Sequence, residues 1–231
     1  MRSKNNLSKA IIFDSGTIIN FAVNGLLEEL KGLKKIFNGK FLITKEVYFE
    51  IVEKPMQIKR FKLEALKIKQ LFSEGILEMS SSAGIDDSEI SKRTKEITNL
   101  ANNTFFGQGN AIHIVDLAES SCLALSMFLS KKEIKNMIAV DERTIRVLGE
   151  KPENLSNLLQ KRLHTTIDSK DENFKSFEGF KFMRSTELVY VAYKRGIVTL
   201  KNHDVLDALL YAMKLNGCSI SDEEIDEIKK I

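Results

Sequence analysis

Four acidic residues lie where a carboxylate could do chemistry, each at the end of an apolar run or beside one. They are Asp14, Glu50, Glu119 and Asp141. Asp14 follows the apolar run 10–13, and Asp141 follows the run 137–140. Short apolar runs bounded by turn residues are typical of strands buried on both faces, and open α/β sheets bind ligands at the carboxyl ends of such strands. We therefore expect Asp14 and Asp141 to lie at one edge of a parallel sheet.

Glu50 and Glu119 are predicted to lie on helices near the same edge. Val47 and Ile51 are four residues apart on one helical face, and Glu50 is adjacent to that face. A carboxylate beside the core is costly unless it is paired or bound to a metal. Glu119 is in the first turn of the helix that follows the apolar run 111–115, so it also faces this edge.

A cluster of these acids would need compensation. Two carboxylates 4 Å apart repel by roughly 4 kcal/mol at an effective dielectric constant of 20, so either their pKa values rise or a divalent cation binds. Ligation by oxygen alone suits Mg²⁺ or Mn²⁺, and such an ion can activate water for phosphodiester cleavage. We predict that the four acids are catalytic metal ligands, with three supporting residues: Ser15, Asp116 and Glu142.

Helix capping is the alternative interpretation of several of these residues. Asp14 and Ser15 are good N-caps, and the segment Asp116-Leu-Ala-Glu119 has the spacing of a capping box. Glu142 can be the exposed neighbour of Asp141. For Glu119 the two interpretations are compatible, because a helix that starts at the carboxyl end of a strand faces the ligand crevice.

The elements that would position these acids alternate along the chain, which predicts βαβ units and a mainly parallel sheet. We expect buried strands at 10–13, 41–43, 111–115 and 137–140. Helices are expected at 18–30, 45–53, 57–72, 88–101 and 116–130, with Lys54-Pro55 ending or bending the second of them. The expected organisation is a single domain over 1–231, with a core at about 10–148, an insertion at about 149–180 and three C-terminal helices at about 185–230.

Composition places the chain among ordinary globular proteins. Hydrophobic residues make up 43% and charged residues 29% of the sequence. The first nine residues are polar and basic, and no apolar stretch approaches the ~20 residues that span a bilayer, so we expect a cytoplasmic protein without a secretory signal or membrane contact. Two cysteines, Cys122 and Cys218, form no disulfide framework, and Cys122 is predicted to be a core residue.

One stretch of the sequence carries mostly positive charges. Residues 54–72 contain six basic residues and a single acidic residue, Glu64. A solvated helix face is one interpretation, and a surface that contacts a phosphate backbone is the other. If the second is correct, this helix borders the path of the substrate.

Four motifs in order resemble a PIN domain. They are Ile-Ile-Phe-Asp14-Ser15-Gly16-Thr, Leu-Ile-Thr44-Lys-Glu-Val47-Tyr-Phe-Glu50-Ile, Asp116-Leu-Ala-Glu119-Ser-Ser-Cys and Ile-Ala-Val-Asp141-Glu142-Arg143. The resemblance covers residues 10–148. It implies a three-layer α/β/α sandwich and a ribonuclease that depends on Mg²⁺ or Mn²⁺ and cleaves RNA at these four carboxylates.

The same resemblance implies partners but does not choose among them. A homodimer, an antitoxin and an RNA-processing partner all fit the family. The insertions at 80–110 and 149–180 make the chain longer than a minimal PIN toxin. Gly16 is the clearest departure, because that position in the family is often Ser or Asn.

Two other functions compete with the nuclease. Phe-Asp14-Ser-Gly-Thr17 is similar to the Asp-x-Asp-Gly-Thr opening of haloacid-dehalogenase-type phosphatases, but Gly16 replaces the second Asp, which is the acid/base of that family. A non-catalytic protein that keeps the fold and binds RNA or another protein is the other alternative.

Overall fold

Five parallel strands form the central sheet, in the order β3-β2-β1-β6-β8. The structure is a computed structural model that describes residues 7–231, so the expectation of a polar, basic start falls mostly on residues 1–6, outside the described chain. The strands are β1 (Lys9–Phe13), β2 (Lys40–Ile43), β3 (Glu78–Met79), β6 (Lys135–Ala139) and β8 (Phe182–Met183). Ile11 of β1 pairs with Phe41 on one side and Met137 on the other. The parallel sheet predicted from the alternating pattern is confirmed.

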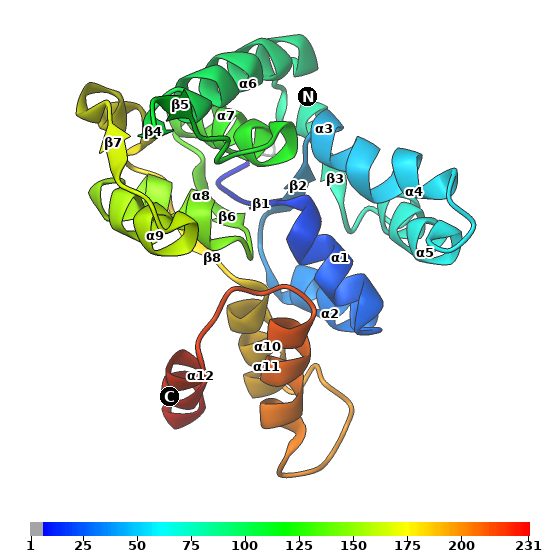
Figure 1. The fold of residues 1–231 in the computed structure, drawn as a ribbon. Coiled ribbons are helices and arrows are strands. Elements are labelled where there is room, and N and C mark those ends of the chain that lie inside the picture. Colours follow the sequence, from blue (N-terminus) through cyan, green and yellow to red (C-terminus); the bar gives the residue numbers. More distant parts are fainter. Residues whose placement is uncertain (1–6) are drawn as a thin grey trace.

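Helices cover both faces of this sheet and complete a three-layer α/β/α sandwich (Figure 1). One layer contains α6 (Asp87–Asn102) and α7 (Leu117–Lys131), and α7 packs against β1 and β6. The opposite layer contains α1 (Ser15–Val23), α2 (Leu27–Ile36), α10 (Ser185–Lys194) and α11 (Val205–Leu215). The remaining helical segments are α3 (Lys45–Tyr48), η1 (Phe49–Glu53), α4 (Lys54–Met56), α5 (Lys62–Ser73), η2 (Ser80–Ala83), α8 (Arg143–Glu150), α9 (Glu153–Leu163), η3 (Asp171–Phe177) and α12 (Asp222–Lys230).

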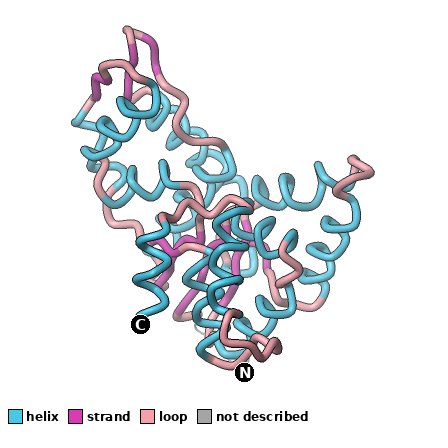
Figure 2. The backbone as a smooth tube through the Cα atoms, turned by 60° about the horizontal axis from the view of Figure 1, so that its bottom comes forward, coloured by secondary structure: helices cyan, strands magenta, loops and turns pink. Residues whose placement is uncertain are grey.

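A second, antiparallel sheet of three strands joins the two insertions that the sequence suggested. Its strands are β4 (Phe105–Gly107), β5 (Asn110–Ala111) and β7 (Ile167–Ser169), in the order β5-β4-β7. Figure 2 shows this small sheet standing apart from the central one. The two insertions therefore form one lobe rather than two separate loops.

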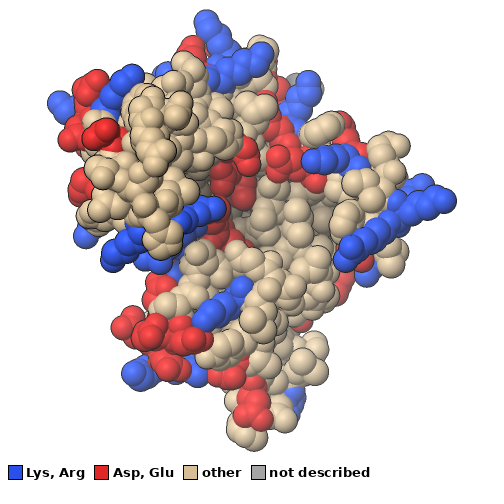
Figure 3. Space-filling view, viewed as in Figure 1, with Lys and Arg blue, Asp and Glu red and all other residues tan. Residues whose placement is uncertain are grey.

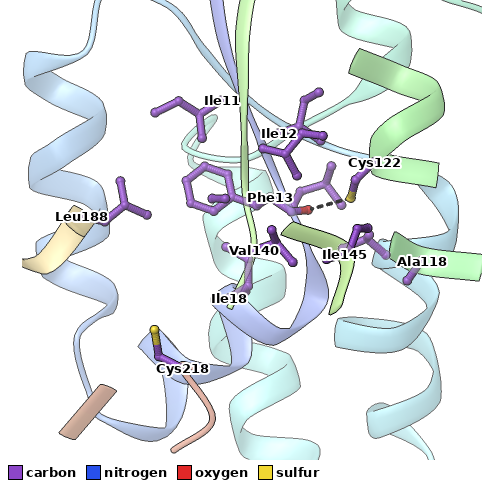
Figure 4. Packing of buried hydrophobic residues seen from close by; sticks show 14 of the residues in the cluster. Ile11, Ile12, Phe13, Ile18, Ala118, Cys122, Val140, Ile145, Leu188 and Cys218 are labelled. Atoms are coloured by element: carbon purple, nitrogen blue, oxygen red, sulfur yellow. Dashed lines mark hydrogen bonds between the residues drawn. The ribbon is translucent and has the colours of Figure 1, made fainter. Parts of the chain in front are cut away.

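The core lies on both sides of β1, where apolar side chains from the strands meet those from the helices (Figure 4). Ile12 and Phe13 are fully buried, as continuous apolar strands require. Cys122 of α7 is also fully buried, and its thiol donates to the backbone oxygen of Phe13 at 3.7 Å. The prediction that Cys122 is a core residue is confirmed, and both cysteines are free thiols.

The helix expected at 18–30 is wrong in its extent, because the chain forms two helices here. α1 ends at Val23 and α2 starts at Leu27. Gly25 between them has φ +71°, a left-handed conformation that glycine adopts without the steric cost of a Cβ atom. The apolar spacing continued across this break, so periodicity alone did not reveal it.

The strand expected at 111–115 is wrong beyond Ala111. Asn102, at the end of α6, satisfies the backbone groups that a neighbouring strand would otherwise bind. Its Oδ1 accepts from the N–H groups of Ile114 and Val115 at 2.7 and 3.0 Å, and its Nδ2 donates to the Val115 oxygen at 2.9 Å. The segment is therefore an ordered connection held by a side chain, and it still delivers α7 to the edge of the sheet.

The helix expected at 57–72 starts late, at Lys62, and residues 57–61 form turns. Ile58 and Phe61, which continue its apolar spacing, remain 40% and 45% exposed, so no burial stabilises a longer helix. Lys54-Pro55 was expected to end or bend the preceding helix, yet helical backbone continues to Met56. Pro55 has no N–H to donate to the preceding turn, and the wider π turn η1 directly precedes it in this continuous helical segment.

The three C-terminal helices are confirmed as α10, α11 and α12, and the Ser221–Glu224 capping box opens the last of them. α8 and β8 are elements that the sequence pattern did not reveal. Across residues 7–231, every helix is too short or too polar to cross a lipid bilayer.

Candidate active site

All seven predicted site residues line one pocket at the carboxyl edge of the central sheet. Its volume is about 310 Å³. The predicted residues are Asp14, Ser15, Glu50, Asp116, Glu119, Asp141 and Glu142, and the wall is completed by Gly16, Ile19, Ala118, Asn216 and Gly217. In the space-filling view, acidic side chains gather in a hollow at the centre of the face (Figure 3). Within residues 7–231, no Lys, Arg or His side chain lines this pocket.

Asp14 links β1 to α1 and has two carboxylate oxygens in different environments. Oδ2 accepts from the Gly16 N–H at 3.1 Å, so the residue does cap α1. Oδ1 is buried and has no hydrogen-bond partner in the described chain. Burial raises the pKa of Asp14 to about 7, and the charges of Glu50 and Asp141 raise it further, while the Gly16 and Ser15 N–H groups oppose the rise. Capping therefore accounts for one oxygen only.

Glu50 enters the pocket from η1, a π turn between α3 and α4. Thr44 caps α3 through the Val47 N–H at 3.3 Å, and the wider π turn then follows. Single π turns inside helices are frequent at functional sites, because they re-aim one side chain. The Ser15 hydroxyl donates to Glu50 Oε2 at 2.6 Å, which gives this partly buried carboxylate the partner it needs. Ser15 is thus a positioning residue for Glu50.

Glu119 is both a cap and a pocket acid. Its Oε2 accepts from the Asp116 N–H at 2.9 Å at the start of α7. Burial raises the pKa of Glu119 to about 8, and the charge of Asp14 is the next cause, while the Asp116 N–H opposes the rise. Asp116 itself is exposed, and its Oδ1 lies 2.7 Å from His113 Nε2. Glu119 therefore both caps α7 and lines the pocket.

Asp141 lies at the end of β6 and is 3% exposed. Its Oδ1 accepts from the Ser185 N–H at 2.7 Å, and its Oδ2 accepts from Asn20 Nδ2 at 3.0 Å. Asn20 also donates to the Met213 oxygen at 3.0 Å, so one amide joins α1, α10 and α11 around Asp141. The sequence analysis missed Asn20. Its only signal was an amide within an otherwise apolar segment, Ile18-Ile19-Asn20-Phe21.

Glu142 lines the pocket, but its main role is structural. It caps α8, where its Oε2 accepts from the Thr144 N–H and its Oε1 accepts from the Thr144 hydroxyl at 3.0 Å. The side chain is exposed at the rim. Its charge raises the pKa of Glu119, which is its clearest influence on the pocket.

The chemistry of the donors fits a hard divalent cation, but their arrangement is incomplete. Every donor is a carboxylate oxygen, which Mg²⁺ and Mn²⁺ prefer, and Asp14 Oδ1 is free to bind one. Within the described residues, however, no group of three or more Asp, Glu, His or Cys side chains is arranged to hold a metal ion. Glu50 and Glu119 instead bind the Ser15 hydroxyl and the Asp116 N–H.

The chain matches no protein-family model, no curated protein and no solved structure.

Proposed function

We propose that this protein is a divalent-metal-dependent ribonuclease that cleaves RNA phosphodiester bonds at the acidic pocket. The observation that carries the proposal is Asp14 Oδ1, a buried carboxylate oxygen with no partner in the described chain. Burying such a group lowers folding stability, and perturbed carboxyl groups in a cleft are typical of functional sites. A cation that binds only the folded chain would recover this free energy.

Three carboxylates of the pocket would hold the ion. Asp14, Glu50 and Glu119 supply the oxygen ligands that Mg²⁺ or Mn²⁺ prefers. When bound, the ion would lower the pKa of an attacking water and stabilise the leaving oxygen of the phosphodiester. Glu50 and Glu119 would rotate toward Asp14 and exchange their present hydrogen bonds for this interaction.

The other residues of the pocket keep the acids in place. The Gly16 N–H fixes Asp14 Oδ2 and leaves Oδ1 free. Asp141 is held by Asn20 and Ser185, and it adds negative charge near Asp14 without having to move.

Two further observations support RNA as the substrate. The four acid-bearing segments resemble those of PIN-domain ribonucleases in order and spacing. The six basic residues of segment 54–72 are all exposed, and the helix that precedes this segment carries Glu50. A phosphodiester polymer could thus contact cations while one phosphate lies at the acids.

A non-catalytic RNA-binding protein is the second candidate. The observation that favours it is the lack of an arranged group of metal ligands in the described chain. On this account the acids serve only as helix caps and as partners of Asn20 and Ser185. A phosphatase that uses Asp14 as a nucleophile is less favoured, because Gly16 provides no side chain to act as the acid/base.

Cleavage of an unstructured single-stranded RNA in Mn²⁺ separates the two candidates. We expect wild-type cleavage that stops in EDTA, and we expect Asp14→Asn to lower the rate by at least on the order of 10²–10³-fold. Asp86→Asn is the matched control: Asp86 caps α6 through the Ser88 N–H at 2.7 Å, as Asp14 caps α1, but it is exposed and does not line the pocket. Equal cleavage by wild type and Asp14→Asn, or none by wild type, would overturn the nuclease.

A further inference from the structure

Residues 54–72 form a hairpin that projects from the domain beside the acidic pocket. This basic hairpin contains α4, the turns at 57–61 and α5 up to Phe72 (Figures 1 and 2). Its six cations are all exposed: Lys54, Lys59, Arg60, Lys62, Lys67 and Lys69. None of them forms an ion pair within residues 7–231. They are therefore free to bind an anionic partner.

The same hairpin exposes apolar side chains that a solvated helix face does not need. Ile58, Phe61, Leu63 and Leu66 are 40%, 45%, 59% and 46% exposed. The guanidinium of Arg60 lies 5.3 Å from the centre of the Phe61 ring. Cations and flat apolar surface thus occur together at the tip, which Figure 3 shows as a line of basic side chains along the right edge of the molecule.

The hairpin is attached rigidly to the pocket. α5 packs against η1, the π turn that carries Glu50. The rings of Tyr48 in α3 and Phe72 in α5 meet edge to face, 5.0 Å apart. Phe49, next to Glu50 in η1, is 52% exposed. A ligand bound along the hairpin would therefore pass close to Glu50.

We propose that the basic hairpin binds single-stranded RNA next to the cleavage pocket, with phosphates on its cations and bases against Phe61 and Phe49. Single strands expose the faces of their bases, and proteins bind them with positive surfaces that carry aromatic side chains. A duplex hides these faces and presents phosphates and 2′-hydroxyls instead, which would leave Phe61 and Phe49 without a role.

Charge argues against the other occupants of an apolar surface. A two-fold dimer through this surface would bring two strongly positive hairpins together, and like charges across an interface oppose association. An acidic protein would match the charge of the hairpin, but its carboxylates would not stack on the exposed Phe61 ring beside Arg60. A second copy would be detected as a dimer by sedimentation.

This inference rests on the proposed ribonuclease for the position of the cut, but binding is measured without cleavage. The probe is a fluorescently labelled RNA of about 20 nucleotides that contains A and C. It is longer than the stretch that a single nucleic-acid-binding domain covers. Anisotropy is measured with the full chain in EDTA, from about 50 to about 300 mM KCl. The same strand annealed to its complement is the duplex probe. If the wild type binds the single strand but does not cleave it in Mn²⁺, only the proposed nuclease is contradicted.

We expect the single strand to bind at least about tenfold more tightly than the duplex, because only the single strand can stack its bases. The triple variant K59Q/R60Q/K62Q should weaken binding more than about tenfold and reduce the slope of log K against log salt by about 2. Phe61→Ala should weaken binding by roughly 5- to 100-fold and leave the salt slope unchanged. The two variants therefore separate phosphate contacts from stacking.

The matched control is K161Q/K175Q/K201Q, which removes the same charge from exposed residues outside the hairpin and the pocket. It should keep wild-type affinity within about twofold and share the wild-type circular dichroism spectrum, as should the hairpin variants. The proposal is overturned if the control weakens binding as much as K59Q/R60Q/K62Q. It is also overturned if the duplex binds as well as the single strand, or if the wild type is a dimer by sedimentation that Phe61→Ala dissociates.

Discussion

The acidic pocket and the basic hairpin meet at η1, yet they hold their charges in opposite ways. In the pocket, Asp14 and Asp141 are 5% and 3% exposed. Three of their four oxygens accept from backbone N–H groups or an amide, and Asp14 Oδ1 has no partner in the described chain. In the hairpin, every cation is exposed and has no acidic partner in the described chain. The pocket therefore lowers folding stability and depends on a built framework, whereas the hairpin is nearly neutral for folding.

We infer from this difference that the pocket is suited to the proposed chemistry and the hairpin to the proposed RNA binding. Buried carboxylates with raised pKa values respond to pH and to cations, and the response follows from their environment. Exposed cations act at longer range, and their effect weakens as salt screens them. Variants in the two regions should therefore change different measurements.

The largest expected effect is a gain of stability in Asp14→Asn. Burial raises the pKa of Asp14 from 3.8 to about 7, so ionising this group costs the folded state up to about 4 kcal/mol at about pH 8. Asparagine has no charge to bury and keeps the cap on α1. Urea unfolding in EDTA should therefore show a more stable variant, whereas Asp86→Asn should show no gain.

The stability gain of Asp14→Asn should disappear at acidic pH. Both raised groups, Asp14 and Glu119, keep their protons in the folded chain after the unfolded chain has lost them. Wild-type stability should thus fall as pH rises from about 4 to about 8, through the contribution of these groups. The gain in Asp14→Asn should be absent near pH 4. A gain that is the same at both pH values would contradict burial as its cause.

A smaller effect, of opposite sign, is expected for Asn20→Ala. The variant loses the donor that joins Asp141 to the Met213 oxygen and leaves a buried carboxylate with one partner fewer. We expect a loss of about 2–4 kcal/mol in the free energy of unfolding. Asn103→Ala is the control, because Asn103 is exposed and binds only Asn99 in its own helix. Equal losses in the two variants would remove Asn20 from the framework of the pocket.

The smallest effect on stability is expected in the hairpin. K59Q/R60Q/K62Q should change the free energy of unfolding by no more than about 0.5 kcal/mol, because exposed and unpaired cations contribute little to folding. Thermal and urea unfolding measure it. A loss of more than about 1 kcal/mol would mean that these side chains hold the hairpin in place, and the contrast with the pocket would be lost.

The sequence predicted the parts of the fold that repeat a simple pattern. The apolar runs before Asp14 and Asp141 identified β1 and β6. β1 is buried from Ala10 to Phe13, as expected of a parallel strand covered on both faces, whereas β6 is buried only at Ile138 and Ala139. β8 consists only of Phe182 and Met183, and two residues are too few to show a hydrophobic period. The strand expected at 111–115 failed because one side chain, Asn102, took the place of a neighbouring strand.

The acids of the site could be predicted from the sequence, but the hydrogen bonds that hold them could not. Asp14, Glu50, Glu119 and Asp141 all line the pocket, as their positions at strand ends and helix starts indicated. Asn20 could not be found, because its partner Asp141 is 121 residues away in the chain. The two roles of Asp14 also required coordinates, since only they distinguish the capping oxygen from the unpartnered one.

Calorimetric titration of Mn²⁺ into the metal-free chain at about pH 8 tests the central claim most directly, because that claim places a cation at Asp14. The account predicts that wild type and Asp86→Asn bind Mn²⁺ equally. It also predicts that Asp14→Asn binds at least about tenfold more weakly, as expected when a ligating charge is lost. Indistinguishable binding by wild type and Asp14→Asn, or no binding by wild type, would contradict the account.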